Sequence, residues 1–343
     1  MPKSFNIKIY TIAGDFVMVV PPSKIMSNIS FSSVINEWQG QLSVKLNYPF
    51  SQTIISMGNI IKVFAVTESY QLGKQIYVWS IDDINRVLEK NGEYIEIRAI
   101  GIGSLLGRGY YKNWSSKVFT KNQEPATTIK DIIDLFLLKY PWAIYYDWTS
   151  IENYWSSLSF DFSNDFNNLA IKKIVSTIPF FWSVDWDWKI NFHPKNWWIG
   201  VLTHNVTVWK DIDGLVASEN SENVKNSYTL NYTGGTVSGS DSASITQYGE
   251  REYEETKAEI SNVGTANIAV ATYILENKDY KKRTSCTVNS QYNIESIRPW
   301  DLLTVRNLDY SILTLQINRI EYDTNTARLE MEKITSLWAE IFA

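Results

Sequence analysis

Two distant stretches of the chain carry the same order of strand and turn signals, and this repeat constrains the fold more than any other feature. Residues 43–66 run from a strand through a turn at residues 57–59 into a second strand. Residues 286–307 repeat this order around a turn at residues 299–301. A long strand and a hairpin follow in both cases, over residues 76–98 and 314–331. Because internal similarity of this kind is typical of a duplicated unit, we expect two related β-domains.

The first hundred residues consist of short runs rich in β-branched and aromatic residues, and turns separate these runs. Such runs favour β-strands. Asn91-Gly92 stands between two of them and is typical of a tight hairpin turn. The series therefore indicates a β-barrel or a β-sandwich.

The middle of the chain changes to helical spacing. Apolar residues recur at helical intervals over residues 129–137, where Thr128 is the expected N-terminal cap, and again over residues 168–178. From residue 180 to residue 192 every even position is apolar, which predicts an aromatic hairpin with its tip near residues 185–189. We expect helices and a hairpin to separate the two β-domains.

Residues 233–244 combine glycine with serine and threonine, and we interpret this composition as a mobile loop. Helical spacing then returns between Val263 and Asn277. The predicted fold class is mainly β (α+β), with two related β-barrel-like domains and a helix-containing α/β middle region. The expected divisions are residues 1–110 for the first β-domain, 111–222 for the middle domain with the aromatic hairpin, and 223–343 for the loop, a helix and the second β-domain.

Composition and charge exclude several classes of protein. A net charge of −5 provides no general attraction to nucleic acid. The N-terminus lacks the pattern of a secretory signal, and polar residues interrupt the apolar runs well before the roughly 20 residues that span a bilayer. We expect a protein made in a cytoplasm, without stable membrane insertion. Cys286 is the only cysteine, so no intrachain disulfide and no Cys/His zinc site can form.

The sequence contains few candidate catalytic or ligand-binding residues. His193 and His204 lie beside apolar neighbours, without a nucleophile motif nearby. Residues 161–167 place oxygen ligands at alternate positions but lack the glycine and the glutamate of a calcium loop. Asp185 and Asp187 leave a glycosidase open, because paired carboxylates can cleave glycosidic bonds. We expect no cofactor, no metal and no enzymatic activity.

Two short motifs have residue types that fix corners of a chain. The first is Tyr248-Gly249-Glu250-Arg251-Glu252, which follows a Ser-rich run. Its tyrosine can anchor a loop, its glycine accepts a positive φ, and its arginine can pair with a carboxylate such as Glu252 or Glu254. The second is the turn Pro299-Trp300-Asp301. We expect both motifs to be structural.

In its order of parts the chain resembles the tail hub proteins of tailed bacteriophages, the baseplate-hub and tail-associated-lysin N-terminal family. In that family a Ser-rich loop leads into a Tyr-Gly-x-Arg-Glu turn, which Tyr248, Gly249, Arg251 and Glu252 match here. The family often carries Pro-Gly-Asp where this chain has Pro299-Trp300-Asp301. The resemblance covers nearly the whole chain.

The resemblance implies a homotrimer whose six β-domains adapt a six-fold tail tube to a three-fold tip. It implies a place in the virion at the tail tip or baseplate, with a distal tail protein or tail tube, a tape measure protein and tip or fibre proteins as partners. DNA would pass through a channel during genome ejection without sequence-specific binding. Because the chain ends after the second β-domain, no wall-degrading activity is expected. The 14 Trp, 20 Tyr and 14 Phe leave two alternatives, a carbohydrate- or receptor-binding virion protein and a glycoside hydrolase.

Overall fold

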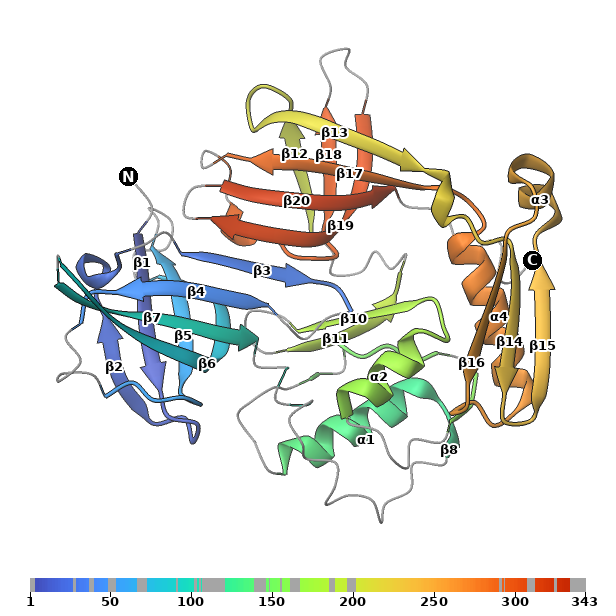
Figure 1. The fold of residues 1–343 in the computed structure, drawn as a ribbon, viewed down its shortest axis with the longest axis horizontal. Helices are drawn as coiled ribbons and strands as arrows, with labels where there is room; N and C mark the ends of the chain where they lie inside the picture. The colour runs from blue at the N-terminus through green and yellow to red at the C-terminus, as the bar shows by residue number, and fades with distance from the viewer. Residues whose placement is uncertain are drawn as a thin grey trace.

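Figure 1 shows two β-domains beside a region that contains the helices. The computed structural model describes residues 4–333 apart from 27–28, 37–39, 49–53, 67–72, 91, 102–103, 105, 107–120, 139–145, 148, 155, 161–166, 185–188, 196–201, 290–291, 293, 307–311 and 324–325. Within the described residues, no helix has the length and apolar character needed to cross a bilayer.

The first β-domain is an antiparallel sheet with the strand order β3-β4-β7-β6-β5-β1-β2. Buried and exposed residues alternate along its strands, as in β4, so that one side of the sheet encloses an apolar core that includes Trp79. A hairpin joins β6 to β7 where Asn91-Gly92 predicts one. The strands are β1 (Ser4–Tyr10), β2 (Phe16–Val20), β3 (Ser30–Val34), β4 (Gln41–Leu46), β5 (Ile60–Val66), β6 (Lys74–Glu89) and β7 (Gly92–Gly101).

The second β-domain has the strand order β13-β17-β20-β19-β18-β12 and a separate apolar core. β12 runs parallel to β18, and the other pairs are antiparallel. Cys286 lies in this core, where burial raises the pKa of its thiol to about 12. The strands are β12 (Thr203–Thr207), β13 (Ile212–Asn220), β17 (Lys281–Val288), β18 (Leu302–Arg306), β19 (Ile312–Asp323) and β20 (Thr326–Lys333).

Five strands of each β-domain follow the same order, which confirms the predicted pair of related β-barrel-like domains. The series β3-β4-β7-β6-β5 corresponds to β13-β17-β20-β19-β18. The long strands β6 and β19 also share a register shift, between Ile81 and Asp83 in β6 and between Ile317 and Arg319 in β19. Because such a bulge bends a strand, both long strands bend at the same point of the repeat.

The two β-domains are joined edge to edge. β3 pairs antiparallel with the second half of β19, from Val34 opposite Arg319 to Phe31 opposite Tyr322. The rings of Phe31 and Tyr322 stack with 4.4 Å between their centroids, and Phe31 meets Trp79 edge-on at 5.2 Å. Strands of both domains thereby form one 13-stranded sheet (Figure 1).

A third core joins the middle region to the insert, by which we mean residues 221–280 between β13 and β17. Its buried residues include Ile132 of α1, Trp182 of β10 and Leu230 of β14. The middle region and the insert therefore pack together as one unit. Its elements are β8 (Lys121–Gln123), α1 (Pro125–Leu137), β9 (Leu158–Phe160), α2 (Asn167–Val175), β10 (Phe180–Val184), β11 (Ile190–Pro194), β14 (Ser227–Tyr232), β15 (Gly235–Ser240), α3 (Ser242–Tyr248), β16 (Glu252–Lys257) and α4 (Val263–Asn277).

Strand pairing crosses the division that we expected between residues 222 and 223. β12 and β13 precede this point, yet they pair with β18 and β17 of the second β-domain. The insert interrupts that domain between two neighbouring strands. A pattern read in chain order does not show that β13 and β17 pair across an insertion.

The prediction of a mobile loop at residues 233–244 is wrong. These residues form β15, which pairs with β14, and the start of α3. A Cβ on Gly239 would lie 2.8 Å from Cγ1 of Val270 and 3.0 Å from Cδ1 of Ile274, so glycine lets α4 approach the strand closely. The glycine content therefore reflects a tight helix–strand contact.

α1 begins earlier than its apolar spacing predicts. Pro125 occupies its first turn, where the missing N–H is not needed, and the Glu124 carboxylate accepts hydrogen bonds from the N–H groups of Ala126 and Thr127. Glu124 is therefore the cap, and Thr128 lies buried within the helix. The helices expected near residues 168–178 and 263–277 and the aromatic hairpin are confirmed as α2, α4 and β10–β11.

Candidate functional site

The corner at residues 299–301 turns on a tryptophan with positive φ. Trp300 has a φ of 77°, a conformation that favours glycine because it has no Cβ. The Trp300 N–H donates to the Ile317 carbonyl at 2.6 Å, and the Ile317 N–H donates to the Asp301 carbonyl at 2.9 Å. The corner is therefore fixed to the bulge of β19.

The first β-domain has the same corner with glycine in place of tryptophan. Gly58 has a φ of 83°, and its N–H donates to the Ile81 carbonyl at 2.8 Å. The Ile81 N–H donates to the Asn59 carbonyl at 2.8 Å. The Asn59 side chain accepts the Ser56 N–H at 2.8 Å, as Asp301 accepts the Arg298 N–H at 2.9 Å. Gly58-Asn59 and Trp300-Asp301 are equivalent positions of the repeat.

The Trp300 side chain connects the second β-domain to the middle region. Its ring is buried and stacks on Phe181 of β10, with 6.3 Å between centroids and 25° between planes. Phe181 in turn lies 6.0 Å from the ring of His193 on β11. A bulky aromatic residue therefore adds a contact between domains at a position whose backbone favours glycine.

Asp301 holds the corner through buried hydrogen bonds. Its carboxylate accepts the N–H groups of Leu202 at 3.2 Å and Arg298 at 2.9 Å, and it lies 2.8 Å from Nε2 of His204. Nδ1 of His204 lies 3.4 Å from the Tyr292 hydroxyl. An aspartate–histidine pair can activate a serine or cysteine nucleophile. Here the other neighbour of the histidine is a tyrosine, and the Asp301 carboxylate ties residues 202–204 to residues 298–301.

The turn at Tyr248–Glu252 holds both connections of the insert. Gly249 follows α3 with a φ of 76°, as its residue type predicts. The Arg251 guanidinium donates to the main-chain oxygens of Ser221 at 2.5 Å and Tyr248 at 3.4 Å, rather than to a carboxylate. The Tyr248 ring meets the Tyr280 ring edge-on at 6.1 Å. Because Ser221 and Tyr280 are the two ends of the insert, the turn fastens it to the second β-domain.

The two predicted motifs do not form one site. Tyr248, Gly249, Arg251 and Glu252 lie at the end of the insert, where Glu252 begins β16. Residues 299–301 lie at the contact between the second β-domain and the aromatic hairpin. Each motif has an architectural arrangement.

Three parts of the chain meet at Asn36, for which the sequence predicted no role. Asn36 has a φ of 58°; its N–H donates to the Trp182 carbonyl at 2.9 Å, and its side-chain oxygen accepts the Trp182 N–H at 3.0 Å. The preceding Ile35 N–H donates to the Asn318 carbonyl at 3.0 Å. This junction connects the first β-domain to β10 and to the bulge of β19. Its only sequence signal is that asparagine tolerates positive φ better than most residues.

A histidine–glutamate pair lies beside the aromatic hairpin. Nδ1 of His193 is 3.4 Å from the Glu152 carboxylate. Burial lowers the pKa of His193 to about 4, with Lys189 adding to the effect, and burial raises the pKa of Glu152 to about 7. His193 is therefore neutral at neutral pH, and its partly buried ring packs against Phe181.

One side of eight neighbouring strands is exposed and polar. We call this side, from β13 through β17, β20, β19, β3, β4 and β7 to β6, the polar face. Two hollows lie in the polar face. One of about 790 Å³ is at the junction of the β-domains, and one of about 380 Å³ lies over β13, β17, β20 and β19. Ion pairs on it include Arg319–Glu321 at 2.6 Å and Lys45–Glu96 at 2.7 Å. The larger hollow mixes both signs of charge, in Arg98, Arg319, Arg328, Asp82, Asp83, Glu321 and Asp323.

Two hypotheses fall on residues that the structure does not describe. Asp185 and Asp187, the candidate glycosidase carboxylates, lie outside the described residues, as do residues 161–166 of the calcium-like segment. Both hypotheses stay predictions from the sequence.

No family model and no curated protein matches the sequence. Solved structures do match it. The tail protein from Neisseria meningitidis MC58 has a TM-score of 0.68 at 9% identity, over 96% of each chain. The 43 kDa tail protein of prophage MuSo2 from Shewanella oneidensis has a TM-score of 0.65 at 11% identity, over 96% of this chain and 98% of that one. The E. coli c3393 protein is a type VI secretion component with structural similarity to the T4 tail proteins gp27 and gp5. It has a TM-score of 0.57 at 9% identity, over 92% and 74% of the two chains.

These similarities extend over nearly the whole chain and therefore concern the arrangement of all its parts. They confirm the expected likeness in fold. This chain has the mainly β fold of phage tail proteins and baseplate-hub structures.

Proposed function

We propose that this protein is a structural hub of a bacteriophage tail tip or baseplate. In this proposal three copies form a ring that adapts a six-fold tail tube to a three-fold tip. The fold, shared with tail proteins from two bacterial genomes, supports a place in a tail. The trimer and the adapter role rest on the internal repeat.

The observation that carries the proposal is the pairing of β19 with β3. It joins two equivalent β-domains edge to edge within one chain, in the same order of strands. A ring of three such chains presents six similar domains to a six-fold partner and three identical chains to a three-fold partner. A duplicated domain is a direct physical route between these two symmetries.

In the ring the polar face lines the central channel. Its arginines and lysines lie beside carboxylates, as in the pairs Arg319–Glu321 and Lys45–Glu96. A wall rich in unpaired cations would retain DNA through its phosphates. A wall of balanced charge lets DNA pass without sequence-specific binding, which suits genome ejection.

The proposed partners follow from this position. A distal tail protein or the tail tube binds one rim, tip or fibre proteins bind the other, and the tape measure protein reaches the channel. The protein is made in the host cytoplasm and is incorporated in the virion. Its role is structural rather than enzymatic, because the distinctive side chains at both corners are engaged in holding the chain.

The native mass of the purified protein tests this proposal. Light scattering after size exclusion should give three times the 39.5 kDa of the chain, and negative-stain class averages should show a three-fold ring. A two-fold dimer would contradict the proposal, and so would a monomer that persists as the concentration is raised. Saturable quenching of tryptophan fluorescence by sugars, from such a monomer, would favour the carbohydrate-binding alternative.

A further inference from the structure

The strand β15 is an open edge of the insert. β14 lies between β15 and β16 in the three-stranded sheet of the insert, and β15 pairs with β14 alone. Figure 1 shows β15 as the outermost strand of the insert, on the side away from α1 and α2. Within the part of the chain that the structure describes, no strand runs along its outer side. The insert therefore ends in a strand that has one partner instead of two.

Half of the main-chain groups of β15 point away from β14. Tyr232 and Gly235 lie opposite each other across a two-residue turn, so they form a hydrogen-bonded pair. Along the unbroken register, such pairs alternate with pairs whose N–H and C=O groups face outward. The Asp241 N–H continues this alternation by donating to the Asn226 carbonyl at 2.9 Å. The residues of β15 whose N–H and C=O groups face outward are Thr236, Ser238 and Ser240.

β15 lacks the features that commonly protect an edge strand from pairing. Lysine, proline or a bulge usually blocks such an edge. The segment Gly235–Ser240 has no charged residue and no proline, and it pairs with β14 without a bulge. Thr236, Ser238 and Ser240 are all exposed. The edge is therefore accessible to another strand.

The two sides of this sheet differ in chemistry, and the side covered by α4 is apolar. α4 lies so close to β15 that a Cβ on Gly239 would be 3.0 Å from Cδ1 of Ile274. Val237 of β15 and Ile274 are partly buried at the border of the core. α4 has no charged residue from Val263 to Leu275. Side chains of an added strand would meet apolar contacts on this side.

The other side of the sheet carries only polar side chains. The hydroxyls of Thr229 and Ser238 lie 3.0 Å apart. The Asn231 amide donates to the Glu254 carboxylate at 2.6 Å, and its oxygen accepts the Thr236 hydroxyl at 2.7 Å. The residues of this side are Ser227, Thr229, Asn231, Thr236, Ser238, Ser240, Glu252, Glu254 and Thr256.

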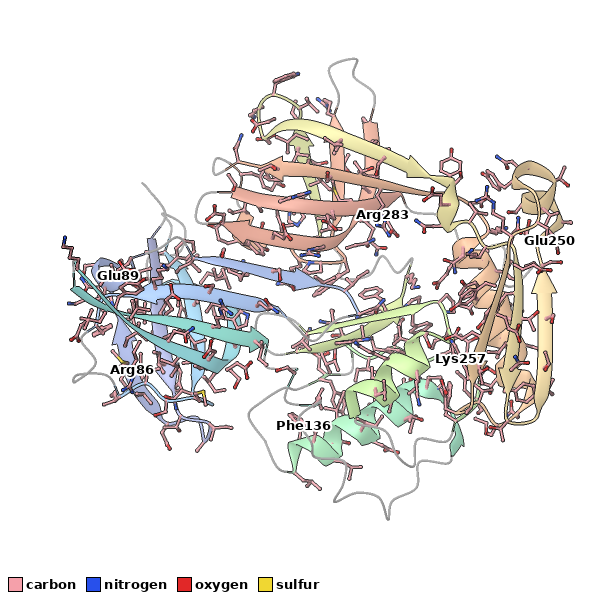
Figure 2. The ribbon with its side chains drawn as sticks, viewed as in Figure 1. Arg86, Glu89, Phe136, Glu250, Lys257 and Arg283 are labelled. Atoms are coloured by element: carbon pink, nitrogen blue, oxygen red, sulfur yellow. The ribbon has the colours of Figure 1, made fainter. Side chains whose placement is uncertain are left out.

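The insert also carries the excess negative charge of the chain. It contains nine acidic and four basic residues, a net charge of −5, which equals the net charge of the whole chain. Arg251 and Lys257 donate to main-chain oxygens, and Lys278 pairs with Asp241 at 3.3 Å. Figure 2 labels Lys257 at the contact with the middle region and Glu250 at the outer end of the insert. The exposed carboxylates belong to Glu222, Glu250, Glu252, Glu254 and Asp279. The insert therefore attracts basic partners.

We infer that β15 accepts an extended segment of another protein, in which apolar residues alternate with lysine or arginine. Its main chain pairs with the outward groups of Thr236, Ser238 and Ser240, so the segment becomes a fourth strand of the sheet. Its apolar side chains face the side of α4, and its basic side chains face the side of the carboxylates, which speeds and orients binding. The site goes beyond the proposed hub role and does not depend on a ring of three chains.

A model peptide tests the site. We would titrate the purified protein into a fluorescein-labelled peptide of four Lys-Val repeats and follow the fluorescence anisotropy at low ionic strength. The peptide should bind saturably, and more weakly as salt is added. A peptide of four Glu-Val repeats should bind roughly tenfold less tightly or not at all. With the Lys-Val peptide bound, hydrogen–deuterium exchange should slow at residues 235–240 and at no other open strand edge.

Substitutions at Ser238 separate strand pairing from general attraction. Ser238→Pro removes an outward N–H that β14 does not use, so the protein should fold and lose peptide affinity roughly tenfold. Ser238→Ala keeps this N–H and should bind like the wild type. Ser238→Lys leaves the main chain intact and repels a basic strand, so it should weaken binding even if the proline variant does not fold. Glu252→Gln with Glu254→Gln should weaken binding at low salt, and less so at high salt.

Three results would overturn the inference. The first is no saturable binding of the Lys-Val peptide up to roughly 1 mM. The second is equal binding by the wild type and by Ser238→Pro or Ser238→Lys. The third is slowed exchange at another strand in place of β15. None of these results bears on the native mass, so the hub proposal is tested separately; a monomer that binds the peptide at β15 would contradict that proposal and support this site.

Discussion

Trp300 allows a direct test of the corner, because its buried side chain stabilises the folded protein whereas its positive φ destabilises it. The buried indole stacks on Phe181, and truncating a buried tryptophan to alanine costs about 3–5 kcal/mol of unfolding free energy. The φ of 77° acts the other way, since a residue with a Cβ is disfavoured there by about 1–2 kcal/mol relative to glycine. Trp300→Ala loses the stacking and keeps the strain, whereas Trp300→Gly loses the stacking and relieves the strain.

We therefore expect Trp300→Gly to be more stable than Trp300→Ala by about 1 kcal/mol, after allowing for the greater freedom of glycine in the unfolded chain. At an ordinary negative φ, the alanine variant would be the more stable of the two. Urea unfolding followed by far-ultraviolet circular dichroism measures both variants without relying on the tryptophan signal. Alanine equal to or more stable than glycine would refute the reasoning.

The equivalent corner provides a matched control for the backbone effect. Gly58 has a φ of 83°, and a Cβ added there would meet no atom within 4 Å. Gly58→Ala should therefore destabilise the protein by about 1–2 kcal/mol through the backbone alone. A neutral Gly58→Ala variant would show that positive φ has little cost at this corner.

Three further predictions concern the core and the buried polar groups. Gly239→Ala should destabilise the insert by about 1–3 kcal/mol in urea unfolding, because the added Cβ would crowd Val270 and Ile274. Gly214→Ala should be nearly neutral in the same assay, since nothing lies within 4 Å of a Cβ added there. Asp301→Ala should lower the free energy of unfolding by about 3–5 kcal/mol, because buried donors lose their acceptor. Asp301→Asn should lower it clearly less, since Asn59 fills the equivalent position of the first β-domain. Equal losses for the two variants would contradict this. Because the pKa of His193 is lowered to about 4, this residue makes folding more favourable as pH rises from about 4 to 6.5. Because the pKa of Glu152 is raised to about 7, that residue makes folding less favourable as pH rises from about 4.5 to 7. The two effects oppose each other in the wild type. In Glu152→Gln only the His193 effect remains, so the melting temperature should rise with pH over about 4–6.5 relative to wild type. In His193→Gln only the Glu152 effect remains, so the melting temperature should fall with pH over about 4.5–7. Unchanged pH profiles would contradict these pKa shifts.

The sequence predicted the parts of the fold that depend on local pattern. Alternation and turn residues indicated the strands of both β-domains, and the matching of residues 57–59 with 299–301 identified two corners that have the same hydrogen bonds. The helices that became α2 and α4 followed from apolar spacing. These features arise from neighbouring residues and can be read from them.

The remaining features depend on contacts between distant residues. The role of Gly239 follows from the approach of α4, and the junction at Asn36 follows from Trp182 and Asn318. The partner of Arg251 is the main chain at Ser221, which comes close only because the insert returns to its starting point. No local pattern predicts the pairing of β3 with β19, although it determines the shape of the polar face.

Single-particle electron cryo-microscopy of the purified protein tests the central claim most directly. We expect three chains and six similar β-domains around an axis, with the polar face inside. A monomer, a two-fold dimer or a ring with the polar face outside would contradict the account.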